Sequence, residues 1–140
     1  MSNLRFATII HILVLVYKYR AEYESCNKVI SSDYIASSIN VNPVVVRREV
    51  KVLKEQGILG VRKGKEGGFY LLKDASEILL GDIYQLIHLD CTIGKLNKTN
   101  PDCEIGKKMN EQLNRMFTVV ESQIIAQLNQ ISLKEFSNQF

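Results

Sequence analysis

The chain has 140 residues, of which 46% are hydrophobic and 24% are charged, and its formal net charge is +3. This length and composition are typical of one globular domain with a modest core, with room for an appended helix. The three cysteines exclude a disulfide-stapled scaffold, because they are too few and their number is odd. We therefore expect a protein of the reducing cytoplasm.

An apolar run near the start, from Phe6 to Tyr17, imitates the centre of a signal peptide. The run is followed by the basic stretch 18–20 in place of a small-residue cleavage site, and it is too short to span a membrane. Its apolar residues recur at intervals of three and four, which predicts a core helix and no membrane partner. We interpret His11 in this run as a packed or partly exposed side chain and not as a ligand.

Two short helices separated by a tight turn are predicted in residues 31–56. The first helix begins at Ser31 or Ser32, whose hydroxyl suits an N-cap. Asn42 is a natural N-cap for the second helix, because Pro43 fits the first helical position, where a missing N–H costs nothing.

The second helix, Pro43 to Gln56, separates into two faces when it is wound at 3.6 residues per turn, and Gly57 is expected to end it in the left-handed conformation. One face is apolar and consists of Val46, Val50 and Leu53. The other is basic, with one valine at its exposed N-terminal end: Val44, Arg47, Arg48, Lys51 and Lys54. A recognition helix presents its N-terminal residues to base edges, where arginine bridges guanine and a valine methyl packs on thymine. We therefore expect this helix to read DNA.

Two short strands are predicted after this helix, at residues 58–61 and 68–72, and a glycine-rich basic tip joins them at residues 62–67. Together they form a hairpin, or wing, whose cations are expected to lie against the phosphate backbone or in the minor groove. The glycines assigned to this wing are Gly64, Gly67 and Gly68. Helix, turn, helix and hairpin in this order make a winged helix-turn-helix.

Positive charge is concentrated in the second helix and the wing. Residues 43–65 contain seven basic and two acidic side chains, a net charge of +5, whereas the rest of the chain sums to −2. A merely solvated surface is not expected to segregate charge in this way, although a basic helix and turn without a DNA role are the alternative interpretation. The candidate DNA-contacting residues are Ser32, Asn42, Val44, Arg47, Arg48, Lys51, Lys54, Arg62, Lys63 and Lys65.

Enzymatic chemistry is not indicated. Residues 60–66 have three residues between the glycines where a phosphate-binding nucleotide loop has four, and Glu66 replaces the hydroxyl residue that would hold magnesium. The sequence also has no histidine near a plausible nucleophile and no paired-carboxylate motif, so we do not expect an enzyme.

Helical spacing returns in the C-terminal half. A short helix is predicted at residues 79–89, followed by a polar, turn-rich loop at residues 90–103. Apolar residues then recur at intervals of three and four from residue 104 to 131, which predicts a helix roughly 40 Å long. Such a helix cannot bury its whole apolar stripe on so small a body, so we expect it to pair with a second copy of the chain. The alternative is a helix folded back on its own domain.

The segment that starts at Leu53, LKEQGILGVRKGKEGGFYL, resembles the L-x-x-x-G-L-x-x-S-x-R-G-x-x-G-G-Y-x-L segment of the Rrf-two family of bacterial regulators. The glycine pair of that family falls on Gly67 and Gly68, and the resemblance covers nearly the whole chain. It implies a homodimeric winged helix-turn-helix transcription factor, usually a repressor. It also implies that the first helix and the long C-terminal helix build the dimer.

The chain departs from the cluster-binding members of that family at its cysteines. Those members carry three cysteines in the loop before the long helix; Cys91 and Cys103 resemble the outer two, and the middle position falls on Asn97 or a neighbour. The position three beyond Cys103 is Gly106, which has no side-chain ligand. A complete iron–sulfur site normally takes four ligands. The hypothesis of an iron–sulfur cofactor is therefore weakened, and such a cluster would have to be shared across the dimer.

Other signals compete with a cluster. Cys91 and Cys103 lie in a polar loop, where exposed thiolates are oxidised and paired, and Cys26 is a further partner if the fold brings it near; this is the interpretation that we favour. Unreactive cysteines are the simple alternative, and a small-molecule or protein effector is another, for which the sequence has no marker. A metal site at His88 and Asp90 is not favoured, because the sequence has no further ligands at a suitable spacing.

We therefore predict a mainly α protein with a small β-wing, in which a winged helix-turn-helix domain precedes a long C-terminal dimerisation helix. Its parts are expected at residues 1–76 (the DNA-binding domain), 77–103 (the short helix and cysteine loop) and 104–140 (the dimerisation helix and a tail frayed from Ser132). The predicted function is a homodimeric, sequence-specific DNA-binding repressor that binds a two-fold operator and responds to a signal at the cysteine loop. The alternative is a small thiol or iron–sulfur protein that uses the winged fold as a scaffold for partner contacts.

Overall fold

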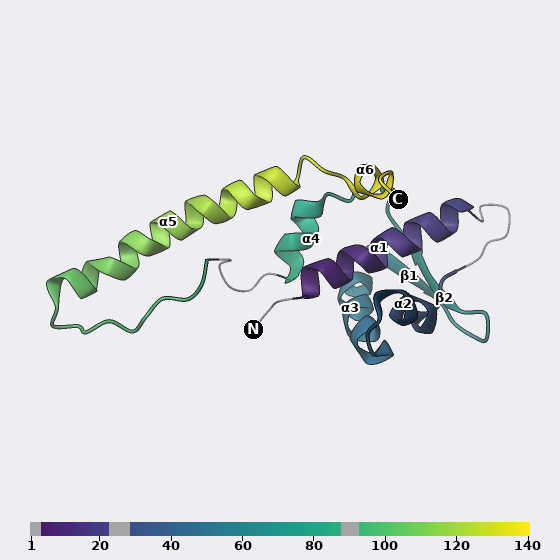
Figure 1. Ribbon diagram of the computed structural model, residues 1–140, viewed down its shortest axis with the longest axis horizontal. Coiled ribbons are helices and arrows are strands. Elements are labelled where there is room, and N and C mark those ends of the chain that lie inside the picture. Colours follow the sequence, from purple (N-terminus) through teal and green to yellow (C-terminus); the bar gives the residue numbers. More distant parts are fainter. Residues whose placement is uncertain (1–3, 23–28, 88–92) are drawn as a thin grey trace.

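The computed structural model describes residues 4–22, 29–87 and 93–140. It confirms the predicted mainly α fold with a small β-wing (Figure 1). Within these ranges the elements are, in chain order, α1 (Arg5–Glu22), α2 (Ser32–Ile39), α3 (Pro43–Glu55), β1 (Leu59–Arg62), β2 (Gly68–Leu71), α4 (Leu80–Ile87), α5 (Glu104–Leu128) and α6 (Leu133–Ser137).

The N-terminal apolar run forms α1, the central helix of the body, which contacts α2, α3, α4, α6 and β2 (Figure 1). Its buried side chains include Ile9, Ile12 and Leu13. They share one hydrophobic core with the predicted apolar stripe of α3, which is buried as expected: Val46, Val50 and Leu53. None of the helices in the described part of the chain is both long and apolar enough to cross a membrane.

The chain enters α2 and α3 through side-chain caps, as the sequence predicts. The Ser31 hydroxyl accepts a hydrogen bond from the Tyr34 N–H at 3.2 Å, and Asn42 Oδ1 accepts one from the Val44 N–H at 2.9 Å. Asn40 closes α2 in the left-handed conformation, with φ of 62°. Asparagine tolerates this conformation better than most residues, so the turn sets α3 against α2 without a glycine.

The wing is an antiparallel hairpin of β1 and β2 that follows Gly57, whose φ of 72° is the predicted left-handed end of the α3 segment. Ile30 adds a short bridge on the other side of β2, where its carbonyl accepts a hydrogen bond from the Phe69 N–H at 2.9 Å. A Cβ at Gly68 would collide with that carbonyl, so the close approach of the two backbones requires glycine at this position.

The C-terminal tail is folded, and the prediction that it frays from Ser132 is wrong. Ser132 caps α6 by accepting a hydrogen bond from the Glu135 N–H at 3.1 Å, and the Leu133 N–H donates to the Ile78 carbonyl at 2.7 Å. The Leu133 side chain is fully buried. The tail therefore pairs with the segment before α4 and adds apolar burial to the core, which offsets the entropy lost on ordering it.

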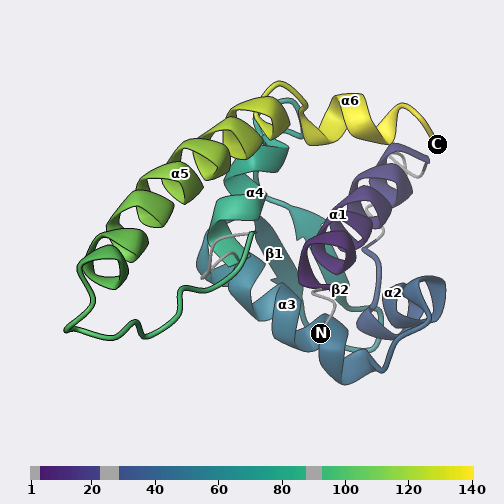
Figure 2. The same ribbon diagram turned by 60° about the vertical axis from the view of Figure 1, so that its left-hand side comes forward.

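Helix α5 ends at Leu128, three residues before the predicted boundary, and extends as a rod away from the winged body (Figures 1 and 2). At about 1.5 Å per residue its length is roughly 37 Å. It is joined to α4 by the Tyr84 hydroxyl, which donates to Glu121 at 2.5 Å, and by Gly81, where any Cβ would collide with Asn129. No residue of α5 is buried within the single chain.

Candidate nucleic-acid interface

Helix α3 has one buried and one exposed face, and the residues predicted to read bases lie on the exposed one. The side chains of Arg47 and Arg48 are 59% and 63% exposed, and Val44 is 62% exposed. Lys51 and Lys54 are exposed as well. The winding of the helix causes this division, because its apolar residues recur every three to four positions and meet the core, which leaves the basic residues facing solvent.

The start of α2 and the turn before α3 form the edge of this surface. Ser32, predicted to contact DNA, is half-buried, and its neighbour Ser31 makes the cap. Asn42 is exposed, but its side-chain oxygen already accepts the Val44 N–H. The amide NH₂ of Asn42 is therefore the part of that side chain which remains as a donor for a ligand.

The sequence prediction omits two residues on this edge, Asp33 and Tyr34. A carboxylate oxygen of Asp33 lies 3.8 Å from an Arg47 guanidinium nitrogen, and both side chains are largely exposed. Tyr34 is 54% exposed, and its ring centroid lies 5.8 Å from that of Tyr19. A tyrosine hydroxyl is a common phosphate-contacting group, and the position of Tyr34 off the apolar stripe of α2 was the signal available in the sequence.

The wing presents the predicted cations Arg62, Lys63 and Lys65, all of which are exposed. Gly64 at its tip has φ of 109°, and its carbonyl accepts a hydrogen bond from the Gly67 N–H at 3.0 Å, which closes the turn. The wing, α2 and α3 lie together on the side of α1 away from α5 (Figure 1).

Glu49 of α3 is a fully buried carboxylate, and it lies three residues after Val46, beside the apolar stripe of the helix. Arg5 of α1 binds it through two parallel hydrogen bonds, Nε to Oε1 and Nη2 to Oε2, both at 2.9 Å. This hydrogen bonding raises the pKa of Arg5 above its ordinary value. Arg48 Nε also lies 3.4 Å from Oε1 of Glu49. Because Glu49 is neutralised from α1, the exposed charges of residues 43–65 are seven basic side chains and one acidic side chain, Glu55.

Cys103 is the candidate cysteine that falls within the described residues. It is exposed and caps α5, where its Sγ accepts the Gly106 N–H at 3.4 Å. The remaining candidates for redox or metal chemistry lie outside the described residues: Cys26, His88, Asp90 and Cys91. Within residues 4–22, 29–87 and 93–140, no group of three or more His, Cys, Asp or Glu side chains is placed to hold a metal ion.

The family model of Rrf2, described as an iron-dependent transcriptional regulator, matches residues 4–139. The chain belongs to the Rrf2 family. YwnA of Bacillus subtilis (strain 168), a candidate HTH-type transcriptional regulator, is 36% identical over 139 residues, which cover 99% of this chain and 98% of YwnA. The crystal structure of a candidate transcriptional regulator from Lactobacillus plantarum has a TM-score of 0.79 and 25% identity, covering 96% of this chain and 88% of its own. The crystal structure of a candidate DNA-binding protein has a TM-score of 0.72 and 35% identity, and the match covers 94% of this chain and 97% of that protein's chain.

Membership of the Rrf2 family confirms the resemblance and the winged fold. Members of this family are transcriptional regulators and not enzymes, and this chain is accordingly a transcriptional regulator. The family description refers to iron. The described residues do not form an iron site by themselves, because they include one cysteine and no cluster of metal-ligating side chains.

Proposed function

We propose that this Rrf2-family regulator is a homodimeric repressor that reads a two-fold DNA operator through α3 and the wing. The observation that carries the proposal is the two-faced α3, whose apolar stripe is buried while Val44, Arg47 and Arg48 are exposed. In the proposed complex the N-terminal half of α3 enters the major groove. Arg47 and Arg48 then bond guanine edges, and Val44 packs on a thymine methyl group.

The other candidate residues are proposed to hold α3 in register on the phosphate backbone. Phosphate contacts carry no sequence information themselves, but they supply much of the affinity and make it fall with salt. This group consists of Ser32, Asn42, Lys51, Lys54, Arg62, Lys63 and Lys65, and we add Tyr34 because it is exposed on the same edge.

The proposed division of labour along the chain follows its elements. Residues 1–76 recognise DNA, and α1 within them also contributes to the dimer. Residues 77–103, with α4 and the cysteine loop, receive the signal. Residues 104–140 pair the two copies, and the docking of α6 on α1 links this part mechanically to the winged unit.

Pairing is supported by apolar surface on α5 that the single chain leaves uncovered. Ile105 is 71% exposed and Met116 is 58% exposed, on a helix without buried residues. Such a stripe on a rod of this length is typical of a helix that packs on another helix.

A largely apolar groove of about 720 Å³ offers a matching surface. One wall is α1, with Phe6, Ile10 and Val14, and the other includes Leu128 at the end of α5 and Phe136 of α6. We place the partner copy at this groove, because two-fold symmetry then covers α1 and α5 of both copies at once. The two recognition helices would thereby be held at a fixed separation.

Control of DNA affinity is proposed to act at the start of α5. The Cys103 thiol caps the helix, and the Asn97 carbonyl accepts a hydrogen bond from the Asn110 side chain at 2.7 Å, so the loop is fastened to the first turns. The signal that we favour over a ligand or a shared cluster is oxidation by a peroxide, which transfers one oxygen to the Cys103 sulfur, releases the other as water and thereby alters this cap. A shift of α5 would then change the separation of the recognition helices.

Fluorescence polarisation tests the proposal, with DNA from upstream of the protein's own gene compared with a scrambled duplex of equal composition. Reduced and mildly oxidised protein are measured at several salt concentrations, and a non-reducing gel and intact mass are taken from the same samples. Specific binding that weakens with salt and changes on oxidation is expected. Absence of specific binding at moderate salt in every redox state would end the proposal.

Two variants of Cys103 separate its redox role from its capping role. Cys103→Ser keeps a capping oxygen without thiol chemistry, whereas Cys103→Ala lacks both. We expect DNA binding by the serine variant to be insensitive to oxidant and similar to that of the reduced protein. A serine variant that still responds to oxidant would remove Cys103 from the mechanism.

The repressor assignment is tested by transcription in vitro. Addition of the protein should lower transcription from a promoter that overlaps the operator, and increased transcription would contradict the assignment.

A further inference from the structure

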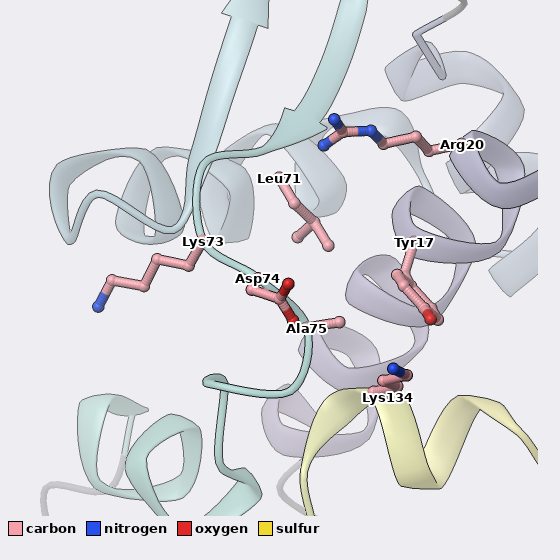
Figure 3. A pocket seen from close by; sticks show the side chains of 7 residues that line it. All are labelled: Tyr17, Arg20, Leu71, Lys73, Asp74, Ala75 and Lys134. Carbon is pink, nitrogen blue, oxygen red and sulfur yellow. The ribbon is translucent and has the colours of Figure 1, made fainter. Parts of the chain in front are cut away.

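A polar cavity of about 300 Å³ lies where the end of α1, the segment after β2 and the start of α6 meet (Figure 3). Its buried apolar part is formed by Leu71 and Ala75, and its rim includes Tyr17, Arg20 and Lys134. This volume is at the lower end of the range for small-molecule sites. None of the residues proposed to contact DNA lines this cavity, so it is separate from the recognition surface.

Positive charge exceeds negative charge around the cavity. Figure 3 shows Arg20 and Lys134 on opposite sides of Asp74, with the ammonium group of Lys73 pointing away from them. The Asp74 carboxylate accepts hydrogen bonds from the Ser76 hydroxyl at 2.6 Å and the Ser76 N–H at 2.8 Å, which lower the pKa of Asp74 and keep it ionised. Two lining cations, Arg20 and Lys134, therefore lie around one carboxylate whose hydrogen-bonding capacity is already partly used.

We propose that this cavity binds a small anionic metabolite that carries a carboxylate or phosphate group. The planar guanidinium of Arg20 is suited to two oxygens of such a group, and the ammonium of Lys134 attracts it as a point charge. The Tyr17 hydroxyl, on the same wall as Lys134 in Figure 3, supplies a neutral donor. Leu71 and Ala75 leave an apolar floor for a short hydrocarbon part of the ligand.

The bound anion would connect parts of the chain that carry different roles. Arg20 belongs to α1, and Leu71 ends the wing strand β2. Lys134 lies in α6, where its N–H donates to the Ala75 carbonyl at 3.2 Å, and α6 follows α5 directly in the chain. An anion shared by Arg20 and Lys134 would therefore fasten the end of α5 to the winged unit. That this changes DNA affinity rests on the proposed function, whereas the binding site does not.

Titration calorimetry on the full chain tests the site, with inorganic phosphate and succinate as probes. Arg20→Gln and Lys134→Gln remove charges that face the cavity, and Lys73→Gln removes the same charge from a side chain that points away. We expect at least one probe to bind, with affinity reduced about 10-fold or more in the first two variants, since each loses a charge-assisted hydrogen bond. The Lys73→Gln variant should bind as the unchanged chain does. The preferred probe distinguishes phosphorylated from carboxylic ligands.

The outcomes separate the site from the proposed function. If neither probe binds, or if Arg20→Gln binds equally well, the site is refuted. If a variant fails to fold, amide chemical shifts of the unchanged chain decide: perturbation around Tyr17, Ala75 and Lys134 supports the site, and perturbation confined to α3 and the wing refutes it.

Fluorescence polarisation tests the effect on DNA binding. The bound anion should shift operator affinity about 5-fold or more, with Arg20→Gln at equal ionic strength as the control. Anion binding without this shift would refute the regulatory step, whereas absence of DNA binding would contradict only the proposed function.

Discussion

Glu49 connects the recognition helix to the rest of the fold through one carboxylate. A buried carboxylate costs free energy unless it is paired, and the two parallel hydrogen bonds from Arg5 supply that partner. Arg48 lies 3.4 Å from the same carboxylate. Glu49 is therefore expected to fix both the position of α3 against α1 and the starting orientation of Arg48, an arginine proposed to read bases.

Replacement of this carboxylate by an amide should lower stability. We expect Glu49→Gln to reduce the free energy of unfolding by about 1–3 kcal/mol, because Arg5 loses a charged partner with two acceptor oxygens. Chemical denaturation measures this, and Glu55→Gln, at an exposed position of the same helix, should change stability by less than about 0.5 kcal/mol. Equal stability of the two variants would contradict the structural role of Glu49.

Base-reading and phosphate-contacting residues should differ in their mutational signatures. Arg47→Ala and Arg48→Ala are each expected to cost about 1–3 kcal/mol of operator binding and to relax base preference. Lys65→Ala should weaken every sequence alike and reduce the salt slope by about 1. Polarisation against an operator and single-base variants of it gives both quantities. An equal loss on all sequences for the two arginines would refute their proposed role.

At the scale of elements, the wing depends on the close approach of β2 to the backbone at Ile30. Gly68→Ala would drive its Cβ into the Ile30 carbonyl oxygen and displace the hydrogen bond from the Phe69 N–H. We expect a loss of about 1–3 kcal/mol in unfolding free energy, as for other overpacked positions. Glu66→Ala, at the exposed tip of the same hairpin, is the control. A Gly68→Ala protein as stable as that control would show that the two backbones move apart at little cost.

The elements with local signals were predictable from the sequence. Ser31, Asn42 and Pro43 mark helix starts because a cap needs only its own next few residues. The two faces of α3 were predictable for the same reason, since helical periodicity is a local property. The short helix α6 carried such a signal as well, Ser132 followed by Glu135, which is the pattern of a capping box, but its few residues do not form an apolar stripe.

Features that depend on distant residues were not predictable. Helical periodicity places Glu49 beside the buried stripe of α3, but its partner Arg5 lies 44 positions earlier in the chain, and no local pattern indicates that pairing. The cavity between Arg20 and Lys134 likewise forms only when α6 docks beside the end of α1. The tail folds because the segment around Ile78 accepts it, and this too is a tertiary contact.

At the scale of the whole molecule, the exposed stripe of α5 predicts self-association. Met116→Glu places a charge on this stripe, and Ser122→Glu places the same charge at an exposed position about 120° around the helix from Met116. Because α5 has no buried residue in the single chain, neither change should unfold the monomer. We expect Met116→Glu to dissociate the dimer and to weaken operator binding, while Ser122→Glu leaves both unchanged. Sedimentation analysis measures the association, and a monomeric unchanged chain would contradict the proposed dimer.

Hydroxyl-radical footprinting on the bound operator most directly tests the claim that paired recognition helices read DNA. Two copies of α3 on one face of a duplex should protect two patches whose centres are about 10–10.5 base pairs, or a multiple of that spacing, apart. At the lowest protein concentration that saturates the operator with the unchanged chain, the Arg47→Ala variant should lose both patches together, because the two half-sites are contacted by identical surfaces. A single protected patch, or two patches that survive this substitution, would contradict the account.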